Sequence, residues 1–204
     1  MILYLVRHGE TPHNRDGLGL GRTDVALTLL GERQAAATGG RLAREPLSRV
    51  YTSPLLRART MALAIAGERG IPVEVREELT ELDVGETEGM PFTEMRERYP
   101  GFLRQWAGPE AVSARMPGGE SLADVAARVA PLVDEIIAGT DDAVAVVSHN
   151  FVTRMLVCRL LGIEVSAFRS FGVDLASVTT VAIRDGRAAV RALNDRCHLH
   201  GLEP

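Results

Sequence analysis

Short apolar runs alternate along the chain with longer stretches of helical periodicity. The apolar runs, typical of buried strands, lie at 2–6, 49–52, 72–75 and 143–147. Apolar residues at three- and four-residue spacing predict helices over 28–44, 55–69, 121–138 and 151–161. This alternation favours an α/β fold, a three-layer α/β/α sandwich with a mostly parallel central sheet and helices on both faces.

Cap and breaker residues predict where two of the helical stretches begin and break. Ser121 and Asp124 have the spacing of a capping box, which opens the third long helix. Pro131 lies inside that helix and predicts a kink, because it lacks a backbone N–H. Residues 92–106 also have a helical pattern, and Pro100 interrupts it.

Two further strands close the pattern near the carboxyl terminus. Residues 178–184 and 188–193 are joined across Asp185-Gly186, a dipeptide typical of a tight hairpin turn. The hairpin predicts an antiparallel edge to the sheet. Its apolar strand 178–183 is expected to be exposed and to pair across a two-fold axis, which predicts a homodimer.

The length and continuity of the sequence indicate one domain. The chain has 204 residues, and no repeat, low-complexity tract or linker interrupts it. We therefore expect a single domain over 1–204. The glycine-rich segment 16–24 and the acidic segment 77–89 are expected to be loops.

Composition narrows the partners and the compartment. The net charge of −4 does not favour nucleic acid or an anionic membrane, and no apolar run approaches the length of a membrane span. Met1 leads directly into a strand-like segment, so no signal peptide is expected. The two cysteines, Cys158 and Cys197, form no disulfide framework. These features together predict a cytoplasmic protein.

Lysine is absent, and all 23 basic residues are arginine. This excludes a Schiff-base lysine and a P-loop lysine. Any fixed positive charge in a site must be a guanidinium, which binds phosphate or carboxylate through two parallel hydrogen bonds.

Three of the apolar strands are followed by residues that can carry chemistry. The first strand runs into Arg7 and His8, the second is followed by Arg57, and the fourth runs into His149. Ligands of open α/β sheets bind at the carboxyl ends of the strands. If these strands are parallel neighbours, their ends share one pocket, which Asn14 enters from the next loop. Two guanidiniums and two imidazoles suit a doubly charged anion such as a phosphate monoester.

Such a reaction also needs a proton donor. The alcohol of a phosphate monoester leaves as an alkoxide unless an acid protonates it. The acidic stretch that follows the 72–75 strand can supply a carboxyl group at the rim of the pocket. Spacing alone does not choose among its acidic residues.

Six ordered motifs resemble those of the histidine phosphatase superfamily, the phosphoglycerate-mutase-like fold. They are L-V-R-H-G-E-T-x-x-N at 5–14, L-T-x-x-G-x-x-Q-A at 27–35, T-S-P-L-x-R-A at 52–58, E-L-x-x-G-x-x-E-G at 81–89, P-G-G-E-S at 117–121 and V-V-S-H at 146–149. The resemblance covers nearly the whole chain and implies an α/β fold of this type.

The resemblance also implies a role for each matching residue. His8 is expected to be the nucleophile that carries the phosphoryl group, and Glu81 the proton donor that later activates water. Arg7, Arg57 and His149 are expected to bind the phosphoryl oxygens. Further contacts with phosphate or substrate are expected at Thr11, Asn14, Leu20, Gly21, Val84 and Asn150. No metal and no cofactor are implied, because arginines neutralise the phosphate.

Details of the motifs favour a phosphatase of small phosphorylated metabolites. The stretches at 80–86, 170–177 and 193–199 are similar to the metal-independent phosphoserine phosphatases. Those enzymes have a glutamine near Leu20 and a histidine near Val84, and the family's tryptophan before the motif asparagine is His13 in this chain. The apolar side chains of Leu20 and Val84 argue against phosphoserine as the substrate.

Three other functions remain open at this level. A phosphoglycerate-type mutase would isomerise phosphoglycerate without releasing phosphate. A non-catalytic sensor would bind a phosphorylated ligand on the same fold. A metallohydrolase would use His8, His149 and a carboxylate as ligands, whereas His198 and His200 are interpreted as tail residues in spite of their H-x-H spacing.

Overall fold

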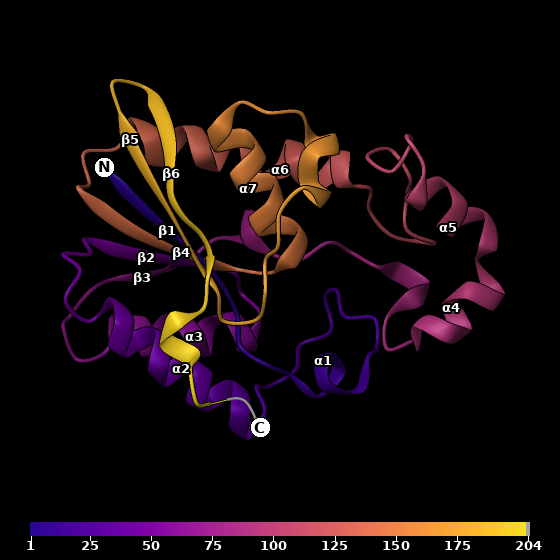
Figure 1. Cartoon of the computed structure of the whole chain (residues 1–204), viewed down its shortest axis with the longest axis horizontal. Helices are drawn as coiled ribbons and strands as arrows, with labels where there is room; N and C mark the ends of the chain where they lie inside the picture. Colours follow the sequence, from indigo (N-terminus) through magenta and orange to yellow (C-terminus); the bar gives the residue numbers. More distant parts are fainter. Residues whose placement is uncertain (203–204) are drawn as a thin grey trace.

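A mixed sheet of six strands forms the centre of the protein. The structure is a computed structural model, which describes residues 1–202. Its strands are β1 (Ile2–Arg7), β2 (Arg49–Thr52), β3 (Val73–Val75), β4 (Ala143–Ser148), β5 (Val178–Arg184) and β6 (Arg187–Asp195). Their order across the sheet is β3-β2-β4-β1-β5-β6 (Figure 1). The first four strands are parallel, and β5 and β6 add an antiparallel hairpin.

Helices cover both faces of this sheet, so the predicted three-layer α/β/α sandwich is confirmed. On one face lie α2 (Leu29–Leu42) and α3 (Leu56–Ala66), and on the other lie α6 (Leu122–Ala138) and α7 (Asn150–Leu161) (Figure 1). The side chains of β1 alternate between the two layers, as the pleat of a strand requires.

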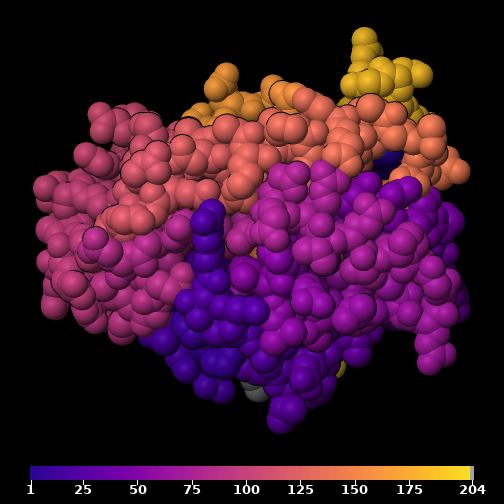
Figure 2. Space-filling view, turned by 180° about the vertical axis from the view of Figure 1, so that it is seen from behind, coloured from indigo at the N-terminus to yellow at the C-terminus, as the bar shows by residue number. Residues whose placement is uncertain are grey.

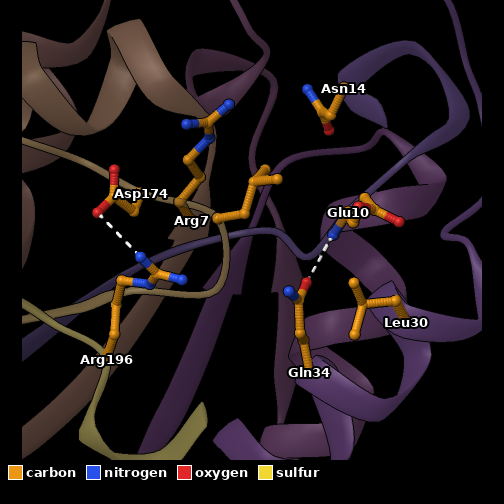
Figure 3. Close-up of a pocket in the computed structure, with 8 residues that line it drawn as sticks. Arg7, Glu10, Asn14, Leu30, Gln34, Asp174 and Arg196 are labelled. Atoms are coloured by element: carbon orange, nitrogen blue, oxygen red, sulfur yellow. Dashed lines mark hydrogen bonds and ion pairs between the residues drawn. The ribbon is translucent and has the colours of Figure 1, made fainter. Parts of the chain in front are cut away.

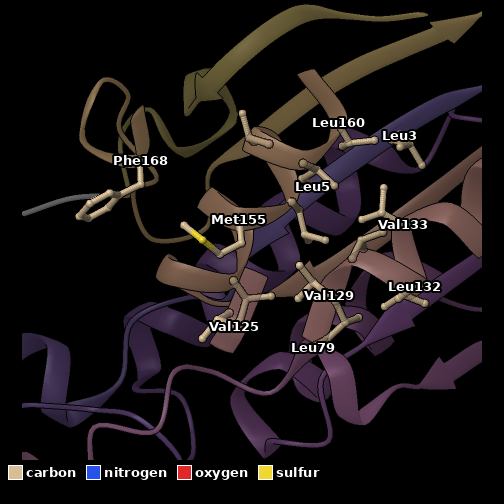
Figure 4. Close-up of a cluster of buried hydrophobic side chains, with 14 of the residues drawn as sticks. Leu3, Leu5, Leu79, Val125, Val129, Leu132, Val133, Met155, Leu160 and Phe168 are labelled. Carbon is tan, nitrogen blue, oxygen red and sulfur yellow. The ribbon is translucent and has the colours of Figure 1, made fainter. Parts of the chain in front are cut away.

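Each layer has its own hydrophobic core. Leu3 and Leu5 of β1 pack with residues of α6 and α7, as Figure 4 shows, whereas Tyr4 and Val6 pack with residues of α2 and α3. The central strand is therefore buried from both sides. Its end has a fixed position, which is what a catalytic side chain at that end requires.

The carboxyl ends of the parallel strands meet at one edge of the sheet. Leu5 and Tyr51 both pair with Val146, so β1, β4 and β2 are in register side by side. Two backbone hydrogen bonds continue the ladder past the strand ends, from His8 N to Ser148 O at 3.0 Å and from Ser53 N to Val147 O at 3.1 Å. The expectation that these strands are parallel neighbours with their ends side by side is correct.

A smaller layer, which we call the cap, lies beyond this edge. The cap comprises residues 85–116 and contains η2 (Gly85–Thr87), α4 (Phe92–Arg98) and α5 (Pro100–Ala107). It contacts the segment after α1 (Pro12–Asp16), where Gly19 N donates to Met90 O at 2.9 Å. Figures 1 and 2 show the cap, in magenta, at one end of the molecule beside the indigo amino-terminal segment.

One expectation about the sheet is wrong. Strand 178–183 was expected to be an exposed edge, but β5 is paired on both sides, with β1 and with β6. The exposed edge on this side is β6, whose residues alternate between exposed and half-buried. The reason is that the hairpin folds its polar strand outward and its apolar strand inward. The homodimer stays a prediction, and it no longer has this strand as its basis.

The local signals at helix ends are largely confirmed. The Ser121–Asp124 capping box is formed. Pro131 lies inside α6, which is one continuous helix, and its kink stays a prediction. The helical pattern of 92–106 breaks at Tyr99, because Pro100 starts α5. The expected loops are more ordered than predicted: α1 ends at Asp16, inside the first loop, while η1 (Glu77–Leu79) and η2 lie in the second.

Two further short helices, η3 (Val165–Arg169) and η4 (Cys197–Leu199), have no counterpart in the predicted elements. Within the described residues, no helix combines the length and the hydrophobicity that crossing a membrane requires.

Candidate active site

His8 lies at the centre of the site, directly after β1. Its side chain is only 3% exposed, and its Nδ1 lies 2.7 Å from the carbonyl oxygen of Gly9. A carbonyl oxygen can only accept a hydrogen bond, so Nδ1 carries the ring proton and donates it. The other nitrogen, Nε2, is therefore left with its lone pair. That is the protonation state that a histidine nucleophile needs.

His149 follows β4 and faces His8. The ring centroids lie 5.1 Å apart and the rings are inclined by 60°. Nε2 of His149 shares a hydrogen bond of 2.8 Å with the hydroxyl of Ser53, which lies at the end of β2. Its Nδ1 is buried and has no hydrogen-bond partner among the described residues. The neighbouring strand therefore fixes the ring and leaves one nitrogen available to a ligand.

Two arginines border the histidine pair. Arg7, the last residue of β1, donates through Nη1 to Val173 O at 2.8 Å. Arg57, in the first turn of α3, is fully buried and donates to Thr23 O at 2.8 Å and Gly21 O at 2.6 Å. The Nε–H group of each arginine is buried and has no acceptor among residues 1–202. A bound anion would satisfy both donors.

Glu81 is the acidic residue that the fold brings to these arginines. Its carboxylate is 4% exposed and accepts hydrogen bonds from the backbone N–H groups of Leu82 at 2.8 Å and of Phe151 and Val152 at 3.2 and 3.4 Å. The first turn of α7 therefore holds this carboxyl group in place. Of the acidic residues in 77–89, only Glu81 is buried.

The buried environment shifts the pKa values of the site in a direction that suits acid–base chemistry. Burial, and then the charges of Arg7 and Arg57, lower the pKa of His8 well below its usual range, and the pKa of His149 moves in the same direction. Burial lowers the pKa of Arg7 to about 10. Burial also raises the pKa of Glu81, while its backbone hydrogen bonds and the two arginines oppose this shift.

A polar cleft of about 620 Å³ adjoins the site at Arg7, whereas His8, Arg57, Glu81 and His149 are not among the residues that line it. Arg7 reaches this cleft from β1 and Asn14 from α1 (Figure 3). Thr11 is fully buried and does not line the cleft. It caps α1, and its hydroxyl donates to Asn14 Oδ1 at 2.8 Å. Thr11 therefore orients Asn14, which leaves the amide N–H₂ of Asn14 for a ligand.

The remaining predicted residues lie around this centre. Gly21 provides the carbonyl that anchors Arg57, and Asn150 accepts a hydrogen bond from Arg154 Nε at 3.0 Å. Leu20 and Val84 line an apolar cavity under the cap. The fold thus brings together Arg7, His8, Arg57, Glu81 and His149, while Leu20, Val84 and Asn150 lie at the periphery.

Three supporting residues were missed from the sequence. Ser53 holds His149, and the T-S-P motif was the available signal. Glu88 accepts hydrogen bonds from Gly21 N and Arg22 N at 2.8 and 2.9 Å, and so fixes the segment that anchors Arg57.

The third of these residues, Arg154, is half-buried on α7. It donates to the carbonyls of Phe168 and Phe171, and its charge acts on Arg7. Nothing in the helical periodicity distinguishes it from a surface arginine.

The geometry defines a class of site. A histidine with a free Nε2, buried cationic donors without acceptors and a buried carboxyl with a raised pKa are the groups that transfer of a phosphoryl group requires. They come from three separate segments of the chain, and Arg7 and His8 lie together at the end of β1.

Comparison with known proteins agrees with this class. The family model of the histidine phosphatase superfamily (branch 1) matches residues 3–196. The chain is 37% identical over 198 residues to phosphoserine phosphatase 1 of Hydrogenobacter thermophilus, a match that covers 97% of this chain and 93% of that protein. It is 33% identical over 178 residues to the glucosyl-3-phosphoglycerate phosphatase of Mycolicibacterium vanbaalenii, covering 83% and 78% of the two chains.

A solved structure gives the same result. The alpha-ribazole phosphatase of Shigella flexneri superposes with a TM-score of 0.87 at 28% identity, covering 96% of each chain. The chain belongs to the histidine phosphatase superfamily, and its fold is the phosphoglycerate-mutase-like fold. Its relatives support a phosphatase. These three relatives are all named phosphatases and differ in the alcohol for which they are named, whereas another relative, 30% identical over 186 residues, is named a probable phosphoglycerate mutase.

Proposed function

We propose that the protein is a metal-independent phosphomonoesterase, which hydrolyses a small phosphorylated metabolite through a phosphohistidine intermediate on His8. The observation that carries this proposal is the hydrogen bond from His8 Nδ1 to Gly9 O, which leaves Nε2 unprotonated beside the buried donors of Arg7 and Arg57.

In the first step, the Nε2 lone pair of His8 attacks the phosphorus. The N–P bond forms as the bond from phosphorus to the alcohol oxygen breaks. The carboxyl group of Glu81 gives its proton to that oxygen, so a neutral alcohol leaves. Arg7, Arg57 and His149 stabilise the charge on the phosphoryl oxygens in the transition state. The raised pKa of Glu81 supports its role as the acid, because it keeps more of the carboxyl protonated near neutral pH.

In the second step, the carboxylate of Glu81 takes a proton from a water molecule as that water attacks the phosphorus. The N–P bond breaks, and its electrons return to Nε2 of His8. Phosphate is released, and both residues regain their starting protonation states. One difficult displacement is thereby divided into two easier ones.

The metallohydrolase alternative has less support from the side chains. Among residues 1–202, no group of three or more His, Cys, Asp and Glu side chains is placed to hold a metal ion. His8 and His149 are accompanied in the site by arginines, which repel a cation.

The test is phosphate release from p-nitrophenyl phosphate, with and without EDTA, by the wild type and the His8→Ala variant. We expect release that EDTA does not affect and that the variant loses by at least about 10⁴-fold. Loss of activity with EDTA would favour the metal-dependent mechanism. Substantial activity in His8→Ala would overturn the nucleophile. With no release at all, isomerisation of phosphoglycerate would be measured next.

A further inference from the structure

An apolar cavity of about 470 Å³ lies between the cap and the catalytic site. Its volume falls in the range of sites for small organic ligands. The side chains that line it are almost all aliphatic, aromatic or thioether groups: Leu20, Val84, Phe92, Met95, Phe102, Leu103, Trp106, Met116 and Phe151. The cavity is separate from the polar cleft in Figure 3, with which it shares no lining residue.

The cavity has little polar character. The hydroxyl of Thr87 is already used, because it donates to Val84 O at 2.8 Å. Arg96 is the charged side chain in the lining, and its guanidinium lies 5.3 Å from the centre of the Phe92 ring. Among the residues that the structure describes, no acidic side chain lines the cavity. An ammonium group placed there would find no carboxylate, and its burial without a partner would be unfavourable.

The cavity borders the proton donor of the proposed mechanism. Phe151 connects the two, because its backbone N–H binds the Glu81 carboxylate at 3.2 Å while its side chain lines the cavity. On the opposite side, Leu20 lines the cavity, and the next residue, Gly21, anchors Arg57. Glu81 must touch the oxygen of the departing alcohol. The carbon skeleton attached to that oxygen can therefore extend from Glu81 past Phe151 into the cavity.

We propose that the alcohol portion of the substrate is an apolar alkyl or aryl group that binds in this cavity. This inference rests on the proposed phosphatase function, since it assigns the side of the site that receives the leaving group. It also explains why apolar residues stand at Val84, three positions after Glu81, and at Leu20, directly before Gly21. A substrate with a charged amino acid as its alcohol portion would leave its ammonium group unpaired.

The fluorescence of Trp106 can report whether this cavity is occupied. Trp106 is the single tryptophan of the sequence, lines the cavity and packs against the rings of Phe102 and Phe151 at 5.5 and 5.6 Å. A ligand that enters the cavity will change the surroundings of the indole. The fluorescence of Trp106 therefore measures occupancy of the cavity without any turnover.

The experiment titrates the wild type with methyl-, butyl- and hexylphosphonate, which keep the phosphate-like head and cannot be hydrolysed at the carbon–phosphorus bond. We expect Kd to fall about two- to four-fold for each methylene group that enters the cavity, with a change in Trp106 emission for the longer chains. The same trend is expected in kcat/KM for the matching n-alkyl phosphates, whose leaving groups have similar pKa values.

Two variants make the test specific. Phe102 is half-buried, so Phe102→Asn should fold and should flatten the dependence of Kd on chain length. Leu63, which is 60% exposed on α3, provides the control, and Leu63→Asn should keep the wild-type dependence. If Phe102→Asn is unfolded by circular dichroism, the titration of the wild type decides alone.

The outcomes separate this inference from the proposed function. Equal Kd values for methyl- and hexylphosphonate, with unchanged Trp106 fluorescence, would overturn the inference even if phosphate is released. Chain-length-dependent binding without any phosphate release would support the cavity as a ligand site and would refute the phosphatase function instead.

Discussion

The carboxyl edge of the sheet and the cap beside it differ in the kind of side chain that they bury. At the sheet edge, His8, Arg57, Glu81 and His149 are buried polar groups, and each is held by a backbone or hydroxyl partner. In the cap, α4 and α5 present apolar side chains to a cavity, and Phe92 remains 55% exposed.

Because of this difference, the two regions have different requirements for accuracy. A buried polar group must be held accurately, because a lost partner costs free energy and misaligns the chemistry. An apolar surface tolerates changes in shape and discriminates only modestly between ligands. We infer that the sheet edge determines the reaction, whereas the cap determines which alcohol is accepted. The relatives of this chain, which are named for different alcohols, fit this division.

Of the sheet-edge variants that keep the nucleophile His8, Glu81→Gln is expected to have the largest effect. The amide cannot donate an acidic proton, so kcat for alkyl phosphates should fall about 10²- to 10⁴-fold. The nitrophenyl ester has a good leaving group and should lose far less in its first step. Rates for both esters measure this difference, and exposed Glu86→Gln is the control. An equal loss on both esters would refute Glu81 as the acid.

Arg57→Met should have the next largest effect. It removes a buried charge and the donors to Gly21 O and Thr23 O, so kcat/KM should fall about 10²- to 10³-fold. The control is Arg59→Met, since Arg59 lies on the same helix and is exposed. Steady-state kinetics of the two variants suffice. Equal activity in both would show that the strand-end cluster does not bind the phosphoryl group.

Gly21→Ala tests how tightly the two regions are joined. A Cβ atom at Gly21 would lie 2.6 Å from Leu82 O, so the segment must move and shift the anchor of Arg57. We expect a loss of stability of about 1–3 kcal/mol and a fall in kcat/KM of about ten-fold. Gly40 is the control, because a Cβ atom there would meet open space. Gly40→Ala should stabilise α2 by about 0.5–1 kcal/mol. Urea unfolding and kinetics measure both.

The pH dependence of stability is a smaller effect with a definite sign. Burial and the nearby arginines lower the pKa of His8 in the folded protein below its unfolded value of 6.5. As the pH falls below that value, the unfolded chain takes up a proton that the folded chain does not. The free energy of unfolding should therefore decrease from pH 7 to pH 5, by up to about 2 kcal/mol for this residue.

His8→Asn removes that contribution, so urea unfolding of the variant should depend less on pH over the same interval. The part due to His149 remains, because its pKa is lowered in the same direction. An identical pH dependence in the variant and the wild type would show that His8 titrates normally in the folded state.

The smallest effect is expected in the cap. Phe92→Ser removes a largely exposed ring, so stability should change by no more than about 0.5 kcal/mol. Because Phe92 lines the cavity, Kd for hexylphosphonate should rise, and the activity with methyl phosphate should change less. Thermal unfolding and phosphonate titration check both parts. A large loss of stability would show that the cap belongs to the core and would remove the contrast between the two regions.

Sequence patterns gave much of this fold because they report local preferences. The apolar run at 143–147 became β4, the Ser121–Asp124 box opened α6, and Asp185-Gly186 turned the hairpin. The error about 178–183 came from a property that is not local. Whether a strand is at an edge depends on which strand pairs with it, and the alternating β6 took the exposed position.

The chemistry divides in the same way. The sequence by itself placed Arg7, His8 and His149 at strand ends, excluded lysine and supplied the motifs that assign Glu81 and Arg57. It could not separate Glu81 from its acidic neighbours by spacing, since burial makes the difference and burial comes from contacts with distant α7.

The tertiary structure alone decided which atoms are available for reaction. The Gly9 carbonyl fixes the tautomer of His8, Ser53 directly after β2 orients His149, and Glu88 secures the segment that anchors Arg57. Only packing between the cap and α7 created the apolar cavity at Leu20 and Val84. Residue types and their periodicity can be read from the sequence, whereas hydrogen-bond partners and cavities arise from segments that meet only in the folded protein.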